Sequence, residues 1–171
     1  MKDKKILKLI IAGLFSAIAV ALSGFYIPLG IAKAFPIQHA INIVLGVLLG
    51  PWYAMGAAFV TSTIRVVIGT GSLLAYPGSI VGAVLGGLLY QKYNHLSMAF
   101  IGEIVGTGLL GGLLAFPIAT YFLGKEAAFF AFVVPFSTSA VVGACMSTVV
   151  LLALNRAGLL NKMKLSIREE H

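Results

Sequence analysis

The stretch TSTIRVVIGTGSLLAYPGS, residues 61–79, places Arg65 in a long part of the chain that otherwise avoids charge. The nearest charged residues along the chain are Lys33 before it and Lys92 after it. Apolar runs of more than about 18 residues without charge are typical of membrane-spanning helices. The stretch therefore raises two questions: which solvent surrounds this chain, and what a guanidinium group does inside it.

The composition answers the first question. Hydrophobic residues make up 60% of the 171 positions and charged residues only 10%, whereas a soluble domain carries about 25% charged residues. The sequence therefore predicts an all-α integral membrane protein. No linker or second domain is visible, so residues 1–171 are expected to form a single transmembrane domain. The first apolar segment follows several lysines, as in a signal peptide, but it is longer than a signal core and further spans follow, so we expect it to be retained.

Hydropathy predicts a bundle of six transmembrane helices. Their expected ranges are residues 6–24, 37–51, 53–69, 76–92, 98–122 and 128–154. Basic residues gather at both termini and in the fourth connection, and cytoplasmic flanks of membrane helices collect Lys and Arg. Both termini are therefore expected in the cytoplasm, in a multi-pass protein of a bacterial or archaeal cell membrane. This distribution accounts for the net charge of +7 without a nucleic acid partner, since no basic run contains interleaved aromatic residues.

The uncharged polar residues indicate where a ligand binds. Side chains three and four residues apart share one face of a helix, and such faces occur at the start of the second predicted helix and near the outer end of the third. The loop after the third helix adds further polar residues on the same side of the membrane. The sequence predicts an outward-facing pocket formed by Gln38, His39, Asn42, Ser62, Arg65, Thr70, Ser72 and Tyr76. The first outer loop, which carries Lys33, is expected to close over it.

Other interpretations of these residues stay open. Arg65 could extend toward the lipid headgroups without contacting any ligand, and His39 alone could be an interior histidine whose hydrogen bonds are satisfied. Glu103 is expected near the cytoplasmic side, too far from Arg65 for a direct salt bridge, and it could contact lipid headgroups or a partner chain. Ser137, Thr138 and Ser139 are expected to bond mainly to their own helix backbone, and the alternative is that they line the pocket.

Several kinds of chemistry are absent from the sequence. It contains no Walker-type nucleotide-binding motif, no zinc-protease motif and no nucleophile elbow. Cys145 is the single cysteine and has no partner for a disulfide or a cysteine metal site. We therefore expect no enzyme activity, cofactor or metal. What remains is a small membrane protein that binds a solute and depends on other proteins for energy.

Three segments resemble a known family. They are FPIQHAINIVLGVLLGPWYA (35–54), AFVTSTIR (58–65) and GTGSLLAYPGSIVGAVLGGLLY (69–90). They are similar to the ThiW group of S components, the substrate-binding subunits of energy-coupling factor (ECF) transporters. The resemblance implies a six-helix S-component fold in an ATP-driven importer of a vitamin precursor, here hydroxyethylthiazole, the thiazole precursor of thiamine.

The resemblance also implies protein partners. They are a transmembrane coupling protein and two cytoplasmic ATPase subunits, and the first helix of S components meets the coupling protein through an Ala-x-x-x-Ala ridge. The matching small residues are Gly13, Ala17 and Ala21, whose size allows close approach of another helix.

The neutral ligand does not by itself explain Arg65. The guanidinium could bond loop carbonyls and organise the pocket, or the real ligand could carry a phosphate or a carboxylate. Two other functions also stay open: a stand-alone secondary transporter of a small heterocyclic solute, and a membrane assembly subunit that binds no small molecule.

Overall fold

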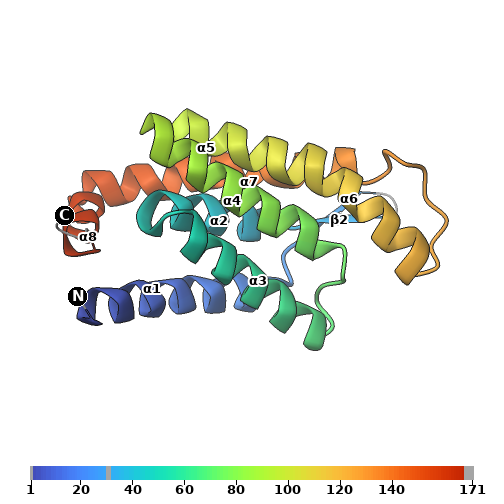
Figure 1. Ribbon diagram of the computed structural model, residues 1–171, viewed down its shortest axis with the longest axis horizontal. Coiled ribbons are helices and arrows are strands. Elements are labelled where there is room, and N and C mark those ends of the chain that lie inside the picture. The colour runs from blue at the N-terminus through green and yellow to red at the C-terminus, as the bar shows by residue number, and fades with distance from the viewer. Residues whose placement is uncertain (1, 30–31, 168–171) are drawn as a thin grey trace.

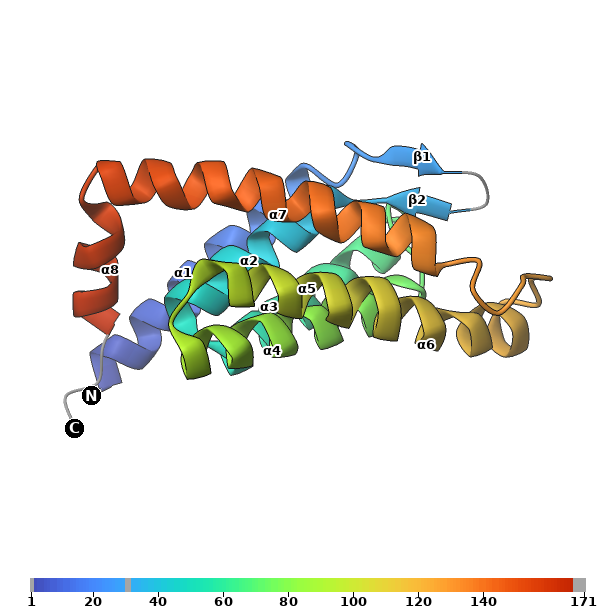
Figure 2. The same cartoon turned by 90° about the horizontal axis from the view of Figure 1, so that it is seen from above.

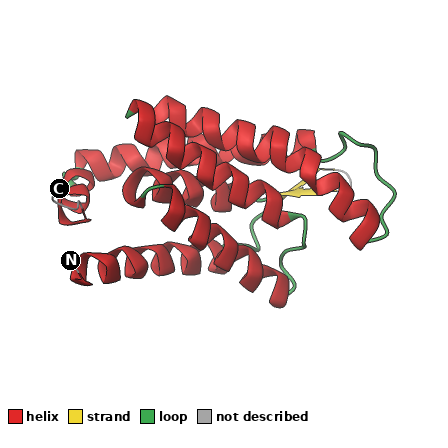
Figure 3. Cartoon of the chain, viewed as in Figure 1, coloured by secondary structure: helices red, strands yellow, loops and turns green. Residues whose placement is uncertain are grey.

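The computed structural model describes residues 2–29 and 32–167, and these residues are helical apart from one short β-hairpin and the connecting loops (Figures 1 and 3). The elements are α1 (Lys2–Ala21), β1 (Ile27–Leu29), β2 (Ala32–Ala34), α2 (Pro36–Leu49), α3 (Pro51–Val67), α4 (Ala75–Tyr93), α5 (Leu96–Glu103), a π-helical segment (Ile104–Gly111), α6 (Gly112–Pro117), a second π-helical segment (Ile118–Phe122), α7 (Val133–Arg156) and α8 (Leu159–Ile167). The four consecutive segments from α5 onward form one helix, Leu96–Phe122.

The predicted helices are confirmed as helices, with shifted ends. The first begins at Lys2 rather than residue 6 and ends at Ala21. The last long helix begins at Val133 rather than residue 128, with Pro135 in its first turn, where a proline costs no backbone hydrogen bond. Among the described helices, Leu96–Phe122 and Val133–Arg156 are long and apolar enough to cross a membrane. That all six cross it stays a prediction.

The long helices lie side by side, with the start of α1 and the C-terminal α8 at one end and the hairpin at the other (Figures 1 and 2). Helix α2 lies in the middle, in contact with α1, α3, α4 and α7. Almost every residue of α2 is buried. At about 1.5 Å per residue, its 14 residues span only about 21 Å. The hairpin connects α1 to α2 near one end of the bundle (Figure 2). Helix α2 therefore begins beneath the hairpin, inside the bundle.

A tight turn reverses the chain between α2 and α3. Gly50 has a φ of +90°, a backbone conformation that glycine adopts without steric cost. Pro51 then begins α3, where the missing N–H would have no partner in the helix anyway. Gly50 and Pro51 therefore form the connection between α2 and α3.

Glycines bring α4 against the helix Leu96–Phe122. The facing pairs are Gly86 with Gly102, Gly82 with Gly106, and Gly78 with Gly111. On α4 the spacing is four residues throughout, whereas on the partner helix it is four and then five. The π-helical segment Ile104–Gly111 explains this difference, because a π-helical turn contains an extra residue.

We expect Gly106→Ala to destabilise the protein by about 1–3 kcal/mol, the usual cost of overpacking a close contact. A Cβ at Gly106 would lie 2.7 Å from the Cα of Gly82, so the two helices must move apart. Gly56→Ala is the matched control, because a Cβ there meets nothing within 4 Å. Thermal unfolding in detergent should show a lowered Tm for Gly106→Ala alone. Equal Tm values for both variants would contradict the close packing of these helices.

Candidate functional site

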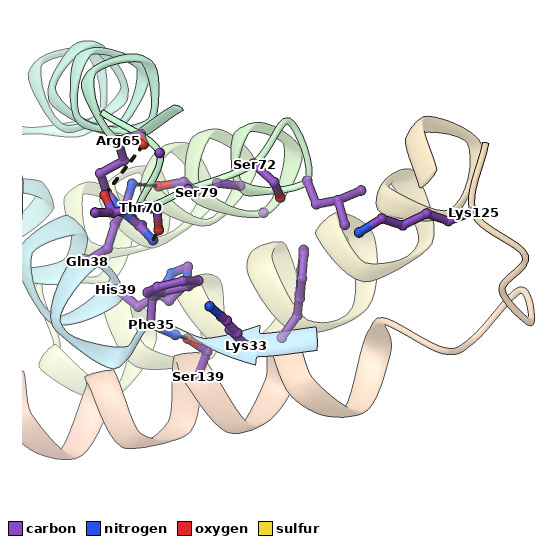
Figure 4. A pocket seen from close by; sticks show the side chains of 16 residues that line it. Lys33, Phe35, Gln38, His39, Arg65, Thr70, Ser72, Ser79, Lys125 and Ser139 are labelled. Atoms are coloured by element: carbon purple, nitrogen blue, oxygen red, sulfur yellow. Dashed lines mark hydrogen bonds between the residues drawn. The ribbon is translucent and has the colours of Figure 1, made fainter. Parts of the chain in front are cut away.

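A cavity of about 240 Å³ lies beneath the β-hairpin (Figure 4). The hairpin and the residue after it, the start of α2, the end of α3 with its following loop, the start of α4, the 123–132 loop and α7 all contribute to its wall. Its polar and charged lining residues are Lys33, Gln38, His39, Arg65, Thr70, Ser72, Ser79, Lys125 and Ser139. Phe35 and Phe136 supply aromatic surface.

Arg65 is held inside the bundle at the edge of this cavity, only 1% exposed. Its Nη1 donates to Gln38 Oε1 and its Nη2 to the carbonyl oxygen of Thr70 at 3.4 Å. The guanidinium carbon lies 3.9 Å from the centroid of the Phe35 ring, in a cation–π contact. Since a buried guanidinium is costly unless it is hydrogen-bonded, these contacts explain its position, and the alternative in which Arg65 extends to the headgroups is wrong.

The backbone of Arg65 fixes the loop after α3. The amide nitrogens of Thr70 and Gly71 both lie 2.9 Å from the carbonyl oxygen of Arg65 and donate to it. Ser23 Oγ donates to Thr70 Oγ1 at 2.9 Å, which ties this loop to the end of α1. The backbone carbonyl of Arg65 therefore holds the start of this loop. The bond from its Nη2 to the Thr70 carbonyl agrees with the interpretation that the guanidinium bonds loop carbonyls.

Two amides connect Arg65 with a buried carboxylate. Gln38 Nε2 donates to Ser79 Oγ at 2.6 Å, and Asn42 Nδ2 lies 3.3 Å from the same oxygen. Asn42 Nδ2 also donates to Glu103 Oε1 at 3.1 Å. The amide orientations follow from the charges, because a guanidinium only donates and an ionised carboxylate only accepts. Gln38 thus presents oxygen to the cation and Asn42 presents nitrogen to the anion.

Glu103 lies at the other end of this network, 0% exposed. Its Oε1 is 2.7 Å from His39 Nδ1 and 3.0 Å from Thr107 Oγ1. Gly82 of α4 leaves room for this group, since a Cβ there would lie 2.9 Å from Glu103 Cδ. The second carboxylate oxygen, Oε2, is buried without a hydrogen-bond partner among the described residues.

The expectation that Glu103 contacts lipid headgroups or a partner chain is therefore wrong, because its carboxylate is buried against His39 and Thr107. The sequence prediction located each helix by its apolar run. This run showed that the second helix is short for a full crossing, but not where along the bundle that helix begins. In the structure α2 begins beneath the hairpin, so His39, close to its start, lies as deep as Glu103. Depth along the membrane normal depends on where each neighbouring helix begins, which hydropathy does not report.

The residues predicted to bind substrate divide into three groups. Five of them line the cavity: Gln38, His39, Arg65, Thr70 and Ser72. Asn42 and Ser62 lie behind it, with Ser62 Oγ accepting from Gln38 Nε2 at 3.1 Å. Tyr76 turns away, because its hydroxyl donates to Thr63 Oγ1 at 3.0 Å and its ring packs against Phe59.

The prediction omitted several residues that the fold brings to the site. Ser139 lines the cavity and accepts a hydrogen bond from the Phe35 amide at 2.7 Å, which favours the alternative that it lines the pocket. Thr138 bonds to the Val134 carbonyl, as expected. Ser79 follows Gly78, one of the three α4 glycines that pack against the helix Leu96–Phe122. The spacing of these glycines indicates helix packing and does not identify Ser79 as a site residue. Glu103 and Thr107, four residues apart, form a polar face that could have been recognised from sequence.

The charged side chains at the cavity are mainly cationic. Three cationic side chains line the cavity, Lys33, Arg65 and Lys125, while the carboxylate lies behind His39. Lys33 itself packs over the ring of Tyr26 at 4.1 Å. Within residues 2–29 and 32–167, no group of three or more His, Cys, Asp or Glu side chains could hold a metal ion.

Comparison with known proteins identifies the family. Residues 9–157 match the family model described as Thiamine-precursor transporter protein (ThiW). No curated protein and no solved structure matches this chain. The matched range includes every helix that contributes to the cavity. It also includes both described helices that are long and apolar enough to cross a membrane, as a transporter requires. The chain is a membrane protein that belongs to the ThiW family of thiamine-precursor transporter proteins.

Proposed function

We propose that this chain is the substrate-binding S component of an ECF importer and that it binds hydroxyethylthiazole in the cavity beneath the hairpin. The observation that carries this proposal is the cavity itself, of about 240 Å³ with aromatic and polar walls. Pockets for drug-sized ligands measure roughly 300–1,000 Å³, so this cavity suits a smaller molecule. A substituted thiazole is of that size.

The walls match the chemistry of this ligand. Phe35 and Phe136 offer aromatic surface against which a thiazole ring can stack. Arg65 is already bonded to Gln38 and Thr70, so it organises the wall and does not require an anionic ligand. The hydroxyl group and the ring nitrogen of the ligand then find partners in the side chains of His39, Ser72 and Ser139.

The proposal includes a membrane orientation. All six long helical segments cross the membrane, with both termini in the cytoplasm and the hairpin facing outward. The lysines of the α1 start lie at the same end as α8, opposite the hairpin (Figure 2). At this end Lys164 of α8 donates to the Tyr90 hydroxyl at 2.5 Å. Basic residues on one side favour that side as cytoplasmic.

The proposed contact with the coupling protein is the ridge of small residues on α1. Gly13, Ala17 and Ala21 are exposed, while Ala12 and Ala19 form the buried face of the same helix. A Cβ at Gly13 would meet nothing within 4 Å. The ridge therefore lies away from the buried face of α1, and its small side chains allow another helix to approach closely.

Calorimetric titration of the purified chain tests the function. Hydroxyethylthiazole should bind more tightly than thiamine, the pyrimidine precursor or the phosphate ester of the thiazole. A stand-alone secondary transporter would instead take up solute into vesicles that contain an ion gradient and no ATPase subunits. A chain that binds none of these compounds would be an assembly subunit, and the proposal would be wrong.

A further inference from the structure

The position of Glu103 behind His39 suggests a role that the cavity alone does not reveal. His39 lines the cavity, and its Nδ1 lies 2.7 Å from Glu103 Oε1. The imidazole therefore stands between a buried carboxylate and the space for the ligand. Because Glu103 occupies Nδ1, the other ring nitrogen, Nε2, is the one left to meet a ligand.

The donors around Glu103 determine which nitrogen carries the hydrogen. Asn42 Nδ2 donates to the same Oε1 at 3.1 Å, and Thr107 Oγ1 lies 3.0 Å both from this oxygen and from the Gly78 carbonyl. An ionised carboxylate only accepts. His39 must then donate through an Nδ1–H. A neutral imidazole has a single N–H, so its Nε2 carries a lone pair.

The surrounding charges favour the neutral imidazole. The buried side chains include one guanidinium, Arg65, and one carboxylate, Glu103, and Gln38, Ser79 and Asn42 connect them. These two charges balance while His39 is neutral. Protonated His39 would form an ion pair with Glu103, but Arg65 would then lack a balancing charge beside a cavity that Lys33 and Lys125 already line. A buried charge that is not compensated costs several kcal/mol.

We infer that Glu103 is a positioning residue that holds His39 in its Nδ1–H tautomer, so that Nε2 selects ligands able to donate a hydrogen bond. The inference rests on the proposed function and makes it more specific. It assigns the alcohol hydroxyl of the thiazole as the donor to Nε2. A thiazole whose hydroxyl is methylated keeps the ring and the oxygen but leaves the Nε2 lone pair without a partner.

Titration of the purified chain with hydroxyethylthiazole and with its methyl ether tests this selection. We expect the alcohol to bind about tenfold more tightly than the ether, since an unsatisfied buried acceptor costs about 1–3 kcal/mol. In Glu103→Gln the new amide can donate to Nδ1, which allows Nε2 to become the N–H, so the preference should fall to about onefold. Glu126→Gln, the same change at an exposed loop residue, should keep the tenfold preference.

Nitrogen-15 NMR of the histidine side chains tests the tautomer without any variant of the site. The chain has three histidines, and His95→Gln and His171→Gln assign the His39 signals by elimination. We expect a neutral ring protonated at Nδ1. A His39 protonated at Nε2, or at both nitrogens, would overturn the inference.

The outcomes separate this inference from the proposed function. Equal affinities for the alcohol and the ether, with thiazole binding intact, overturn the inference and leave the proposed function standing. If no thiazole binds to the wild-type chain, the proposed function is wrong, and the NMR signals of His39 alone decide on the tautomer.

Discussion

Arg65→Ala is expected to weaken hydroxyethylthiazole binding by about 1.5–3 kcal/mol, the range for hydrogen bonds to charged groups, which is about 10- to 150-fold in Kd. The substitution removes the donors to Gln38 Oε1 and the Thr70 carbonyl and the cation–π contact with Phe35. The wall of the cavity that Gln38, Thr70 and Phe35 form therefore loses three contacts. Calorimetry measures the loss, with a thermal melt to check folding.

Arg65→Lys should restore only part of this affinity. An ammonium group keeps the charge that balances Glu103, but it lacks the planar set of five donors with which arginine reaches two acceptors at once. Arg156→Ala is the control, because this exposed arginine at the end of α7 carries the same side chain far from the hairpin. Equal affinities for the wild-type protein, Arg65→Lys and Arg65→Ala would remove Arg65 from the binding site.

The helices could be predicted because each has a long apolar run. The fourth predicted range, 76–92, differs from α4, Ala75–Tyr93, by one residue at each end. The hairpin could not be predicted, because strands of three residues are too short to show the alternation on which strand prediction depends. Helix α8 was missed for a related reason: its nine residues include lysines and polar side chains, so hydropathy passes over it.

The site residues that share a face of one helix could be predicted. The contacts between residues of different helices could not, because they depend on where each helix begins along the bundle. Gln38 and His39 were found because the spacing on a single helix indicates a shared face. The partner of His39 was not found, since the contact with Glu103 requires that α2 begin beneath the hairpin and that Gly82 leave space for a carboxylate. The spacing of five residues between Gly106 and Gly111 likewise depends on a π-helical segment, for which the sequence gives no pattern.

The second large effect is expected from a substitution on the exposed face of α1, and it concerns transport rather than binding. In a reconstituted importer, Ala17→Trp should reduce ATP-driven uptake to background while the affinity of the isolated chain for hydroxyethylthiazole stays unchanged. Ala17 is exposed and lies on the ridge with Gly13 and Ala21, so a large side chain is accommodated within this chain. It would, however, keep the coupling protein from approaching the helix.

Ile18→Trp is the control for this experiment. Ile18 is also exposed, but it points about 100° away from Ala17 around the helix and already carries a large side chain. Uptake by Ile18→Trp should therefore stay near the wild-type rate. Loss of ligand binding in Ala17→Trp would mean that the ridge packs inside the folded chain, and undiminished uptake by this variant would mean that the coupling protein contacts another face. Loss of transport with retained binding is the result that distinguishes a ridge used for coupling from one that only faces lipid.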